Sequence, residues 1–402
     1  MQLRFVIGAA LVLAAQRTSA GDWPQWRGPG RDGLSPEKVK AAWPANGPPI
    51  LWRALVGTGM CSVAVSQGRA YTLGNSNELD TIWCLAALTG KPLWRHTYPA
   101  RLDPQWYEGG PGATPTVDAG RVFTISKWGD VFCLDAANGG LIWQHNLRAE
   151  GLKPNRWGFA GSPLVWSNLV IFNAGAAGIA LDRDTGRVIW STGPNATGYA
   201  SPALGRVDGR ELLLIFAAKA LVALAPGTGR ELWRLPFETK WDTNITDPIV
   251  RRDRLFLSSF SAGFACFALR DGPPQTLYTS TNLYNHLSPG IVLGDYLYAF
   301  SGEAKFTTDF RCLDLATGQV RWTRRDPAFG SLICADGKLL ILSEKGELLL
   351  AAASPAGLEP LARAQILDPV CWTPPALANG LLYAKNARGA LVCVELGGAN
   401  GE

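Results

Sequence analysis

The chain has 402 residues, of which 47% are hydrophobic and 18% are charged, and its formal net charge is +5. This composition is typical of a folded, well-buried protein, and no apolar run after the N-terminus is long enough to span a bilayer. The small positive charge comes without a basic block, which argues against a nucleic-acid partner. The 45 glycines and 27 prolines fit many short strands joined by tight turns.

The first twenty residues have the pattern of a secretory signal peptide. Arg4 gives a basic start, an almost wholly apolar run extends from Phe5 to Ala15, and small residues precede Ala20. Because the run is too short to span a membrane, we expect cleavage after Ala20 and a periplasmic or extracellular protein. A retained membrane anchor is the alternative.

Residues 21–49 are rich in turn formers and show no regular periodicity. They include Trp23 and Trp26 within a stretch of Pro, Gly and Asp residues at 22–33. This composition predicts an irregular N-terminal arm that packs its two tryptophans against the body of the protein.

From residue 50 the sequence repeats a β-hairpin phrase, which is most complete at residues 178–190. Asp182 can accept hydrogen bonds from the amides of the following turn, Gly186 allows a positive φ, and the phrase closes on a tryptophan. The closing aromatics recur every 42 to 49 residues, which is the period of propeller blades. We expect these positions to be structural docking residues: Trp52, Trp94, Trp143, Trp190, Trp233, Tyr278 and Trp322.

Each period contains four short apolar segments, as expected for a four-stranded antiparallel blade. Residues 50–55 form an outer strand with no blade before it, and residues 375–396 supply three strands and then stop. Joining the two removes an exposed sheet edge. The sequence therefore predicts an all-β, eight-bladed β-propeller over residues 50–396, followed by a tail at 397–402. The fifth and seventh repeats depart most from the phrase, and we expect those blades to be the least regular.

The eight cysteines are predicted to be packing residues. Five of them occupy equivalent places in successive repeats, where the roughly 7 Å limit on Cα separation for a disulfide would be exceeded. These five are Cys84, Cys133, Cys266, Cys312 and Cys393.

The repeat resembles the tryptophan-docking repeat of the pyrroloquinoline-quinone (PQQ) propellers, Ala-x-Asp-x-x-Thr-Gly-x-x-x-Trp. Residues 180–190 match it at each defining position, and the resemblance covers residues 50–396. The stretch 22–29 also resembles the arm that opens many exported bacterial proteins with this repeat. The resemblance implies one of two kinds of relative. Quinoprotein alcohol dehydrogenases hold PQQ and calcium, whereas the outer-membrane assembly propeller holds neither and binds protein partners.

The loops before each innermost strand meet at the axis of a propeller, where an aromatic-walled pocket is the usual form of a ligand site. Three interpretations stay open: the aromatics plug the funnel, they line a small-molecule or glycan site, or they form a docking face for a protein. The candidate residues in these loops are Trp106, Tyr107, Glu108, Trp157, Tyr199, Trp241, Asp242, Asn244, Tyr284, His286 and Trp372.

Four lysines fall in or beside the turns between the second and third strands, which open on the same face as these loops. They are Lys127, Lys219, Lys305 and Lys345. A cluster of them around the funnel would favour an acidic ligand, and ordinary solvation of the turns is the alternative.

The dehydrogenase alternative makes demands that the sequence meets poorly. The resemblance would imply a vicinal cysteine pair, calcium ligands from Glu and Asn, and a catalytic Asp. No two cysteines are adjacent, and the spacing of Glu108, Asp242, Asn244 and Asp247 matches no cation-binding motif. Only one of the three histidines, His286, is in the axial set, which excludes a multi-histidine metal site.

The sequence therefore predicts an exported, monomeric binding or scaffolding module that meets a protein partner, a small molecule or a glycan at its axial face. A reduced quinoprotein oxidoreductase with PQQ and calcium is the alternative. We assign no catalytic residue and no metal ligand.

Overall fold

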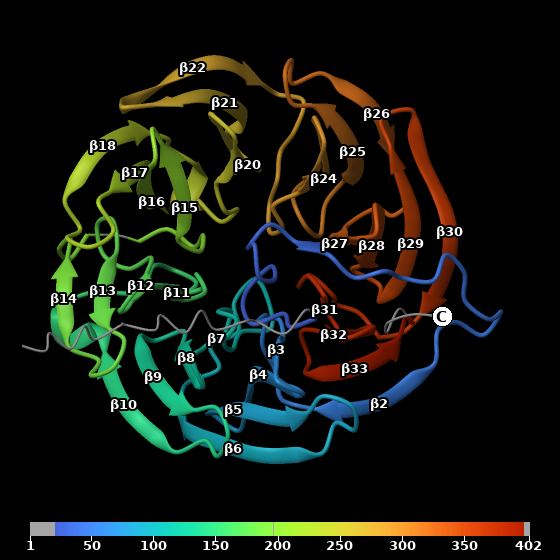
Figure 1. Ribbon diagram of the computed structural model, residues 1–402, viewed down its shortest axis with the longest axis horizontal. Coiled ribbons are helices and arrows are strands. Elements are labelled where there is room, and N and C mark those ends of the chain that lie inside the picture. Colours follow the sequence, from blue (N-terminus) through green and yellow to red (C-terminus); the bar gives the residue numbers. More distant parts are fainter. Residues whose placement is uncertain (1–20, 196, 398–402) are drawn as a thin grey trace, which may run out of the picture.

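The computed structural model describes residues 21–195 and 197–397, and within them eight sheets surround a common axis, each with a four-stranded antiparallel blade (Figure 1). Seven sheets have four strands and one has five. This arrangement confirms the predicted eight-bladed β-propeller. The predicted signal peptide, residues 1–20, lies outside the described residues. In the described ranges, no helix is long and apolar enough to cross a membrane.

The first four blades follow each other along the chain. Blade 1 contains β3 (Ala64–Ser66), β4 (Arg69–Ser76), β5 (Leu79–Ala86) and β6 (Pro92–Pro99). Blade 2 contains β7 (Thr116–Asp118), β8 (Arg121–Ile125), β9 (Asp130–Asp135) and β10 (Leu141–Asn146), followed by the 3-10 helix η1 (Leu147–Glu150). Blade 3 contains β11 (Leu164–Trp166), β12 (Leu169–Phe172), β13 (Ile179–Asp182) and β14 (Val188–Ser191). Blade 4 contains β15 (Ala203–Val207), β16 (Arg210–Phe216), β17 (Ala220–Leu224) and β18 (Glu231–Pro236), followed by η2 (Lys240–Asp242).

The other four blades complete the ring. Blade 5 contains β19 (Ile249–Arg251), β20 (Arg254–Ser259), β21 (Gly263–Arg270) and β22 (Gly272–Ser280). Blade 6 contains β23 (Ile291–Leu293), β24 (Tyr296–Gly302), β25 (Thr308–Asp314) and β26 (Val320–Arg324). Blade 7 contains β27 (Gly330–Ala335), β28 (Lys338–Ser343), β29 (Glu347–Ser354) and β30 (Gly357–Gln365), with β1 (Leu34–Ser35) added in parallel to β27. Blade 8 contains β31 (Ala376–Ala378), β32 (Leu381–Lys385), β33 (Ala390–Glu395) and β2 (Ile50–Leu55).

The ring is closed by the pairing of β2 with β33. The two strands run antiparallel, with Trp52 opposite Cys393 and Leu55 opposite Ala390. An N-terminal outer strand thus joins the C-terminal blade, as the sequence predicts. Because β2 pairs with β33, neither the N-terminal strand nor the three C-terminal strands present an open sheet edge to each other's side of blade 8.

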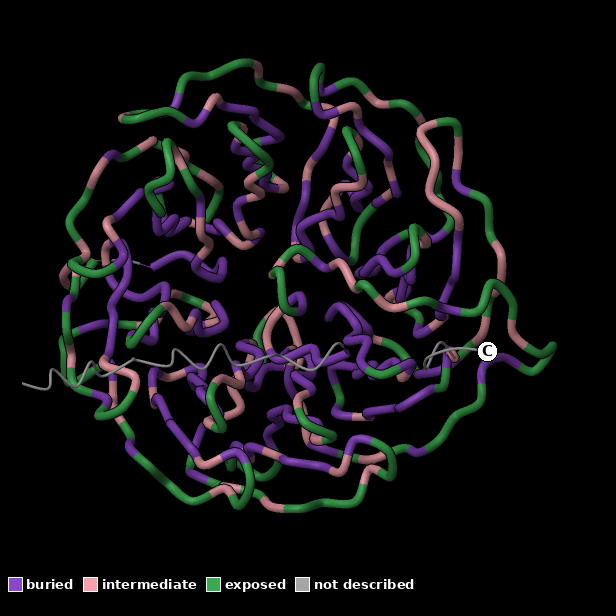
Figure 2. Tube along the Cα trace, in the orientation of Figure 1, coloured by how far each residue is buried: buried purple, intermediate pink, exposed green. Residues whose placement is uncertain are grey.

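The core lies between neighbouring blades. All five residues of β17 are buried, because both faces of an inner strand meet an adjacent sheet. The outer strands alternate instead, and β18 buries Trp233 while leaving Glu231 and Arg234 exposed. Figure 2 shows the same gradient, with buried backbone inside the ring and exposed backbone at its rim. The alternation follows from the two-residue period of a strand that has one covered face.

The repeated phrase forms the joint between blades. Trp143 of blade 2 packs on Gly186 of blade 3, and its Nε1 donates to the Arg183 carbonyl oxygen at 2.9 Å. Gly186 has a φ of +72°, and Asp182 Oδ1 accepts from the Thr185 amide at 2.8 Å, as predicted. Equivalent side-chain donors bond a carbonyl of the next blade at Trp52, Trp94, Trp190, Tyr278 and Trp322.

Of blades 5 and 7, which the sequence predicts to be the least regular, only blade 5 has an additional register shift between its strands. The outer pair of blade 5, β21 and β22, has two register shifts, whereas the corresponding pair in each other blade has one. Blade 7 keeps a single shift and instead gains β1 on its inner edge. Blade 5, whose outer strand β22 contains Pro273 and Pro274, therefore has a more disturbed ladder than blade 7.

The N-terminal arm lies across the axis of the ring, where Figure 1 shows the chain passing from the centre to β1. Trp23 exchanges backbone hydrogen bonds with Val65 of β3, both at 2.8 Å. Buried Arg27 donates to the carbonyl oxygens of Pro289 and Gly290 at 3.1 and 2.9 Å, just before β23. Because these contacts reach opposite sides of the ring, the arm fills the centre and holds the inner strands together.

Candidate functional site

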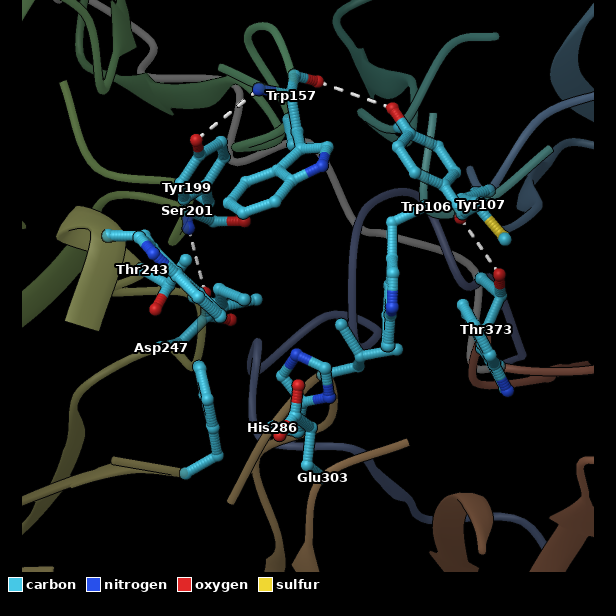
Figure 3. A pocket seen from close by; sticks show the side chains of 18 of the residues that line it. Trp106, Tyr107, Trp157, Tyr199, Ser201, Thr243, Asp247, His286, Glu303 and Thr373 are labelled. Carbon is cyan, nitrogen blue, oxygen red and sulfur yellow. Dashed lines mark hydrogen bonds between the residues drawn. The ribbon is translucent and has the colours of Figure 1, made fainter. Parts of the chain in front are cut away.

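A cavity of about 480 Å³ lies at the axis, on the face where the loops before the inner strands meet (Figure 3). Seven of the eleven candidate residues line it: Trp106, Tyr107, Trp157, Tyr199, Trp241, His286 and Trp372. They come from the loops that precede six of the blades, so the closed ring brings together residues that are up to 266 positions apart in the sequence.

Two groups of aromatic rings form the walls. Trp106 lies 5.8 Å from Trp372 between ring centroids and 5.7 Å from His286. On the other side Trp157 lies 5.9 Å from Tyr199. The hydroxyl of Tyr107 donates to the Trp157 carbonyl oxygen at 3.3 Å and so connects the two groups. These bonds hold the rings apart around an open space.

The arm supplies the floor of the cavity. Trp26 lines it, and its Nε1 donates to Asp247 Oδ2 at 2.6 Å. The other oxygen of Asp247 accepts from the Ser201 amide at 2.8 Å. Burial lowers the pKa of Arg31 to about 10, although the nearby Asp247 carboxylate opposes the shift. Arg27 shows the same pattern, because burial lowers its pKa and Asp247 raises it. Asp247 is thus held between two amide or indole donors and two buried guanidinium groups.

His286 is a neutral member of the wall. Its side chain is 7% exposed, and burial lowers its pKa to about 4. Its Nδ1 accepts from the Ala304 amide at 3.0 Å, so the proton of the neutral ring is on Nε2. The ring also packs against Phe260, with centroids 4.7 Å apart. His286 therefore offers the cavity a neutral N–H donor.

Three basic side chains each cover a tryptophan of the cavity. Arg156 lies 5.1 Å from the Trp157 ring centroid, and Lys240 lies 4.3 Å from that of Trp241. Lys305 lies 4.7 Å from the ring of Trp106 and donates to the carbonyl oxygen of the same residue.

The lysines predicted on this face do not form one cluster. Lys127 is buried and paired with Asp103 at 2.9 Å. Lys219 and Lys345 are outside the cavity lining, whereas Lys127 lies 5.2 Å from the Tyr107 ring centroid and Lys305 lies over Trp106 and Trp372.

Four candidate residues do not line the cavity: Glu108, Asp242, Asn244 and Tyr284. Asn244 is buried, and its amide donates to the carbonyl oxygens of Ala217, Ala218 and Phe237 at 2.7 to 3.2 Å. It therefore shapes the loop that carries Trp241. The other three occupy the same loops as cavity residues, but their side chains lie outside the lining.

The structure also adds lining residues that the sequence did not indicate. Phe260, Glu303 and Phe306 come from turns between second and third strands, which share the face with the axial loops. The sequence already placed lysines in these turns, so the same reasoning applied to their aromatics would have found them. Met60 lies in the loop before the innermost strand of blade 1, where the reasoning from loop position also applied, whereas Trp26 belongs to the arm and carried no such signal.

Comparison with known proteins identifies the family. Residues 78–324 match the PQQ_2 family, described as outer membrane protein assembly factor BamB. The chain belongs to this family. It is 23% identical over 254 residues to BamB of Shewanella oneidensis, covering 58% of this chain and 62% of that one. It is 25% identical over 221 residues to a quinoprotein ethanol dehydrogenase of Pseudomonas putida, covering 48% of this chain and 33% of that one. The chain thus spans less than two thirds of the length of either relative.

Solved structures of proteins of both kinds have the same fold. BamB from Moraxella catarrhalis has a TM-score of 0.61 and 17% identity, covering 87% of this chain and 100% of that one. A quinohemoprotein alcohol dehydrogenase from Comamonas testosteroni has a TM-score of 0.68 and 14% identity, covering 95% and 81%. At these identities the likeness concerns the fold alone.

The residues around the cavity do not fit the PQQ and calcium site that the quinoprotein relatives imply. All eight cysteines are buried free thiols, and none is adjacent to another. Among the described residues there is no group of three or more His, Cys, Asp or Glu side chains placed to hold a metal ion. Asp247 and Glu303 are the carboxylates of the lining, and both oxygens of Asp247 already accept hydrogen bonds from the protein.

Proposed function

We propose that this PQQ_2 propeller is an exported binding module that takes a small ligand into its axial cavity. The observation that carries the proposal is the open, aromatic-walled cavity of about 480 Å³, a volume within the usual range for small-molecule sites. A funnel plugged by its own aromatics would leave no such space. Export to the periplasm or the exterior rests on the signal-like pattern of residues 1–20.

The cavity is held in shape before any ligand arrives. The backbone of Trp157 is held on both sides, because its carbonyl accepts from Tyr107 at 3.3 Å and its amide donates to the Tyr199 hydroxyl at 3.4 Å, and its ring packs 5.9 Å from that of Tyr199. A ligand that enters need not order these rings, so less binding energy is lost on immobilising side chains. The floor formed by Trp26 supports entry from one face only.

Binding of a protein partner at the same face is the second candidate. Trp241 is 51% exposed and Phe306 is 66% exposed at the mouth of the cavity, which is unusual for such large apolar side chains. Exposed aromatics of this kind are common centres of protein interfaces. In either case we propose that the protein acts as a monomer.

The test is a screen of a neutral fragment library against the mature protein, with ligand-observed NMR as the readout. We expect hits that are lost on Trp157→Ala, because its ring forms a wall. Trp166→Ala is the control, since Trp166 ends β11 and lies outside the cavity. Hits that survive Trp157→Ala, or no hits at all, would refute the small-ligand proposal.

The dehydrogenase alternative needs a separate measurement. The protein is titrated with PQQ and calcium while cofactor absorbance and dye-linked alcohol oxidation are followed. We expect neither saturable binding nor turnover, because the carboxylates of the cavity are too few and partly engaged. Micromolar binding accompanied by alcohol oxidation would overturn the binding-module proposal.

A further inference from the structure

The balance of charges around the axial cavity indicates the chemical class of its ligand. Arg156 and Lys240 line the cavity, and Lys305 covers two of its tryptophans, Trp106 and Trp372. In the described residues no carboxylate lies within 4.0 Å of any of these three cations. Their charges are therefore not neutralised by the protein itself.

The acidic side chains of the cavity do not cancel this excess. Asp247 accepts hydrogen bonds from Trp26 and Ser201 and lies beside the buried guanidinium groups of Arg27 and Arg31. Its charge is thus already compensated at the floor. Glu303 is the other lining carboxylate, and His286 is neutral at physiological pH because burial lowers its pKa to about 4. Within the lining, two cations with no carboxylate within 4.0 Å, Arg156 and Lys240, stand against the single carboxylate of Glu303, so the lining keeps an excess of positive charge.

The same three cations are stacked on the rings that form the walls. Because each cation lies over a wall ring, a negative group that reaches one of them is held next to the aromatic wall formed by Trp157, Trp241 or Trp106. Flat apolar faces together with a negative charge and several hydroxyl groups meet these conditions. The hydroxyl of Ser201 and the Nε2–H of His286 line the cavity as neutral donors for such hydroxyls.

We propose that the axial cavity binds an acidic saccharide, which is a sugar unit that carries a carboxylate. The sugar ring would lie against the tryptophans, and the carboxylate would lie between Arg156, Lys240 and Lys305, the rim cations of the cavity mouth. This inference rests on the proposed function and specifies its ligand. An acidic peptide would also satisfy the charges. A saccharide is the better match because the walls offer ring faces, whereas an extended peptide needs backbone donors and acceptors along a strand edge.

The experiment compares two sugar dimers that differ only at C6, which is a carboxylate in one and an uncharged hydroxymethyl group in the other. Binding of a galacturonate dimer and of the corresponding galactose dimer is measured by calorimetry on the mature protein. We expect the acidic dimer to bind about tenfold or more tightly at low salt, since one charge-assisted hydrogen bond changes affinity by roughly that factor. The preference should shrink as salt rises, because the rim cations are exposed and become screened.

Variants locate the preference on the rim. Arg156→Gln combined with Lys240→Gln should reduce the preference for the acidic dimer to about twofold or less. Lys219→Gln is the matched control, because Lys219 is an exposed lysine in a turn on the same face and outside the cavity lining. The side chains of Arg156 and Lys240 are both exposed, so their replacement should not prevent folding. The salt dependence of binding to the wild type tests the charge preference independently of any variant.

The results that would contradict the acidic-saccharide proposal can be told apart. Equal affinity for the two dimers would exclude the charge preference while leaving the cavity as a binding site. Binding of a glutamate tetrapeptide without binding of either sugar would replace the saccharide by an acidic peptide. If neither dimer binds while Trp157-dependent fragment hits persist, the ligand class is wrong and the proposed function stands. If the fragment hits are also absent, the proposed function itself fails.

Discussion

Replacing Gly186 by alanine tests whether the repeated phrase is a joint between blades and nothing more. A Cβ at this position would lie 2.7 Å from the ring of Trp143, closer than atoms of two side chains approach in folded proteins. The residue also has a φ of +72°, which alanine adopts at a cost. Gly68 has the same φ of +72° and nothing within 4 Å of the added Cβ, so Gly68→Ala carries the backbone cost alone.

The expected magnitudes follow from these two contributions. The left-handed backbone costs about 1–2 kcal/mol in either variant. Overpacking against Trp143 adds about 1–3 kcal/mol in Gly186→Ala only. With an unfolding entropy of roughly 2.1 cal/mol/K per residue, a chain of 402 residues has about 0.8 kcal/mol/K, so Tm should fall about 1–4 °C further in Gly186→Ala.

The assay is thermal unfolding of the two variants and the wild type, followed by tryptophan fluorescence. At 25 °C both variants should bind the fragment hits with the affinity of the wild type, because Gly186 lies outside the cavity lining. Equal Tm values for the two variants would show that the contact with Trp143 stabilises nothing. Loss of fragment binding in folded Gly186→Ala would show that the phrase contributes to function.

Four further predictions concern the arm, a buried histidine, a buried aspartate and the cysteines. Trp26→Phe removes the donor to Asp247 and should cost about 1.5–3 kcal/mol in unfolding free energy, with weaker fragment binding; unchanged values would exclude the arm as the cavity floor. Because burial lowers the pKa of His286 to about 4, the unfolded chain takes up a proton there first, and stability should fall as pH drops from about 6.5 to 4; His286→Gln should make that fall shallower. Asp80 opposes this trend, because burial raises its pKa to about 6, so Asp80→Asn should make the same acid-side fall steeper. No thiol should react with Ellman's reagent in the native protein and eight should react in denaturant, and an early reacting thiol would contradict their burial.

The architecture could be predicted because each blade carries its own signal. The Asp182 turn, the positive φ of Gly186 and the closing Trp190 are local features, and their period gives the number of blades. Closure followed from the incomplete ends, since a lone outer strand and a three-stranded remainder each leave an edge open. The resulting pairing of Trp52 with Cys393 joins residues at the two ends of the ring.

The cavity could be predicted only in part. Loop position identified Trp106, Trp157 and Trp372 as axial, because the topology of a propeller sends those loops to one place. It did not determine the direction of each side chain. Asn244 turns away from the axis to bond three carbonyl groups, although Trp241 in the same loop lines the cavity.

The sequence by itself determined the blades, their number, the closure of the ring and the free state of the cysteines, because these depend on short-range patterns that repeat. Only the tertiary structure decided whether the axial funnel is open, which cations cover its walls and where the arm ends. Those features depend on contacts such as Trp26 with Asp247, 221 positions apart, and no repeat records them. Side chains that meet at the axis come from different blades, so their packing is set by the assembled ring.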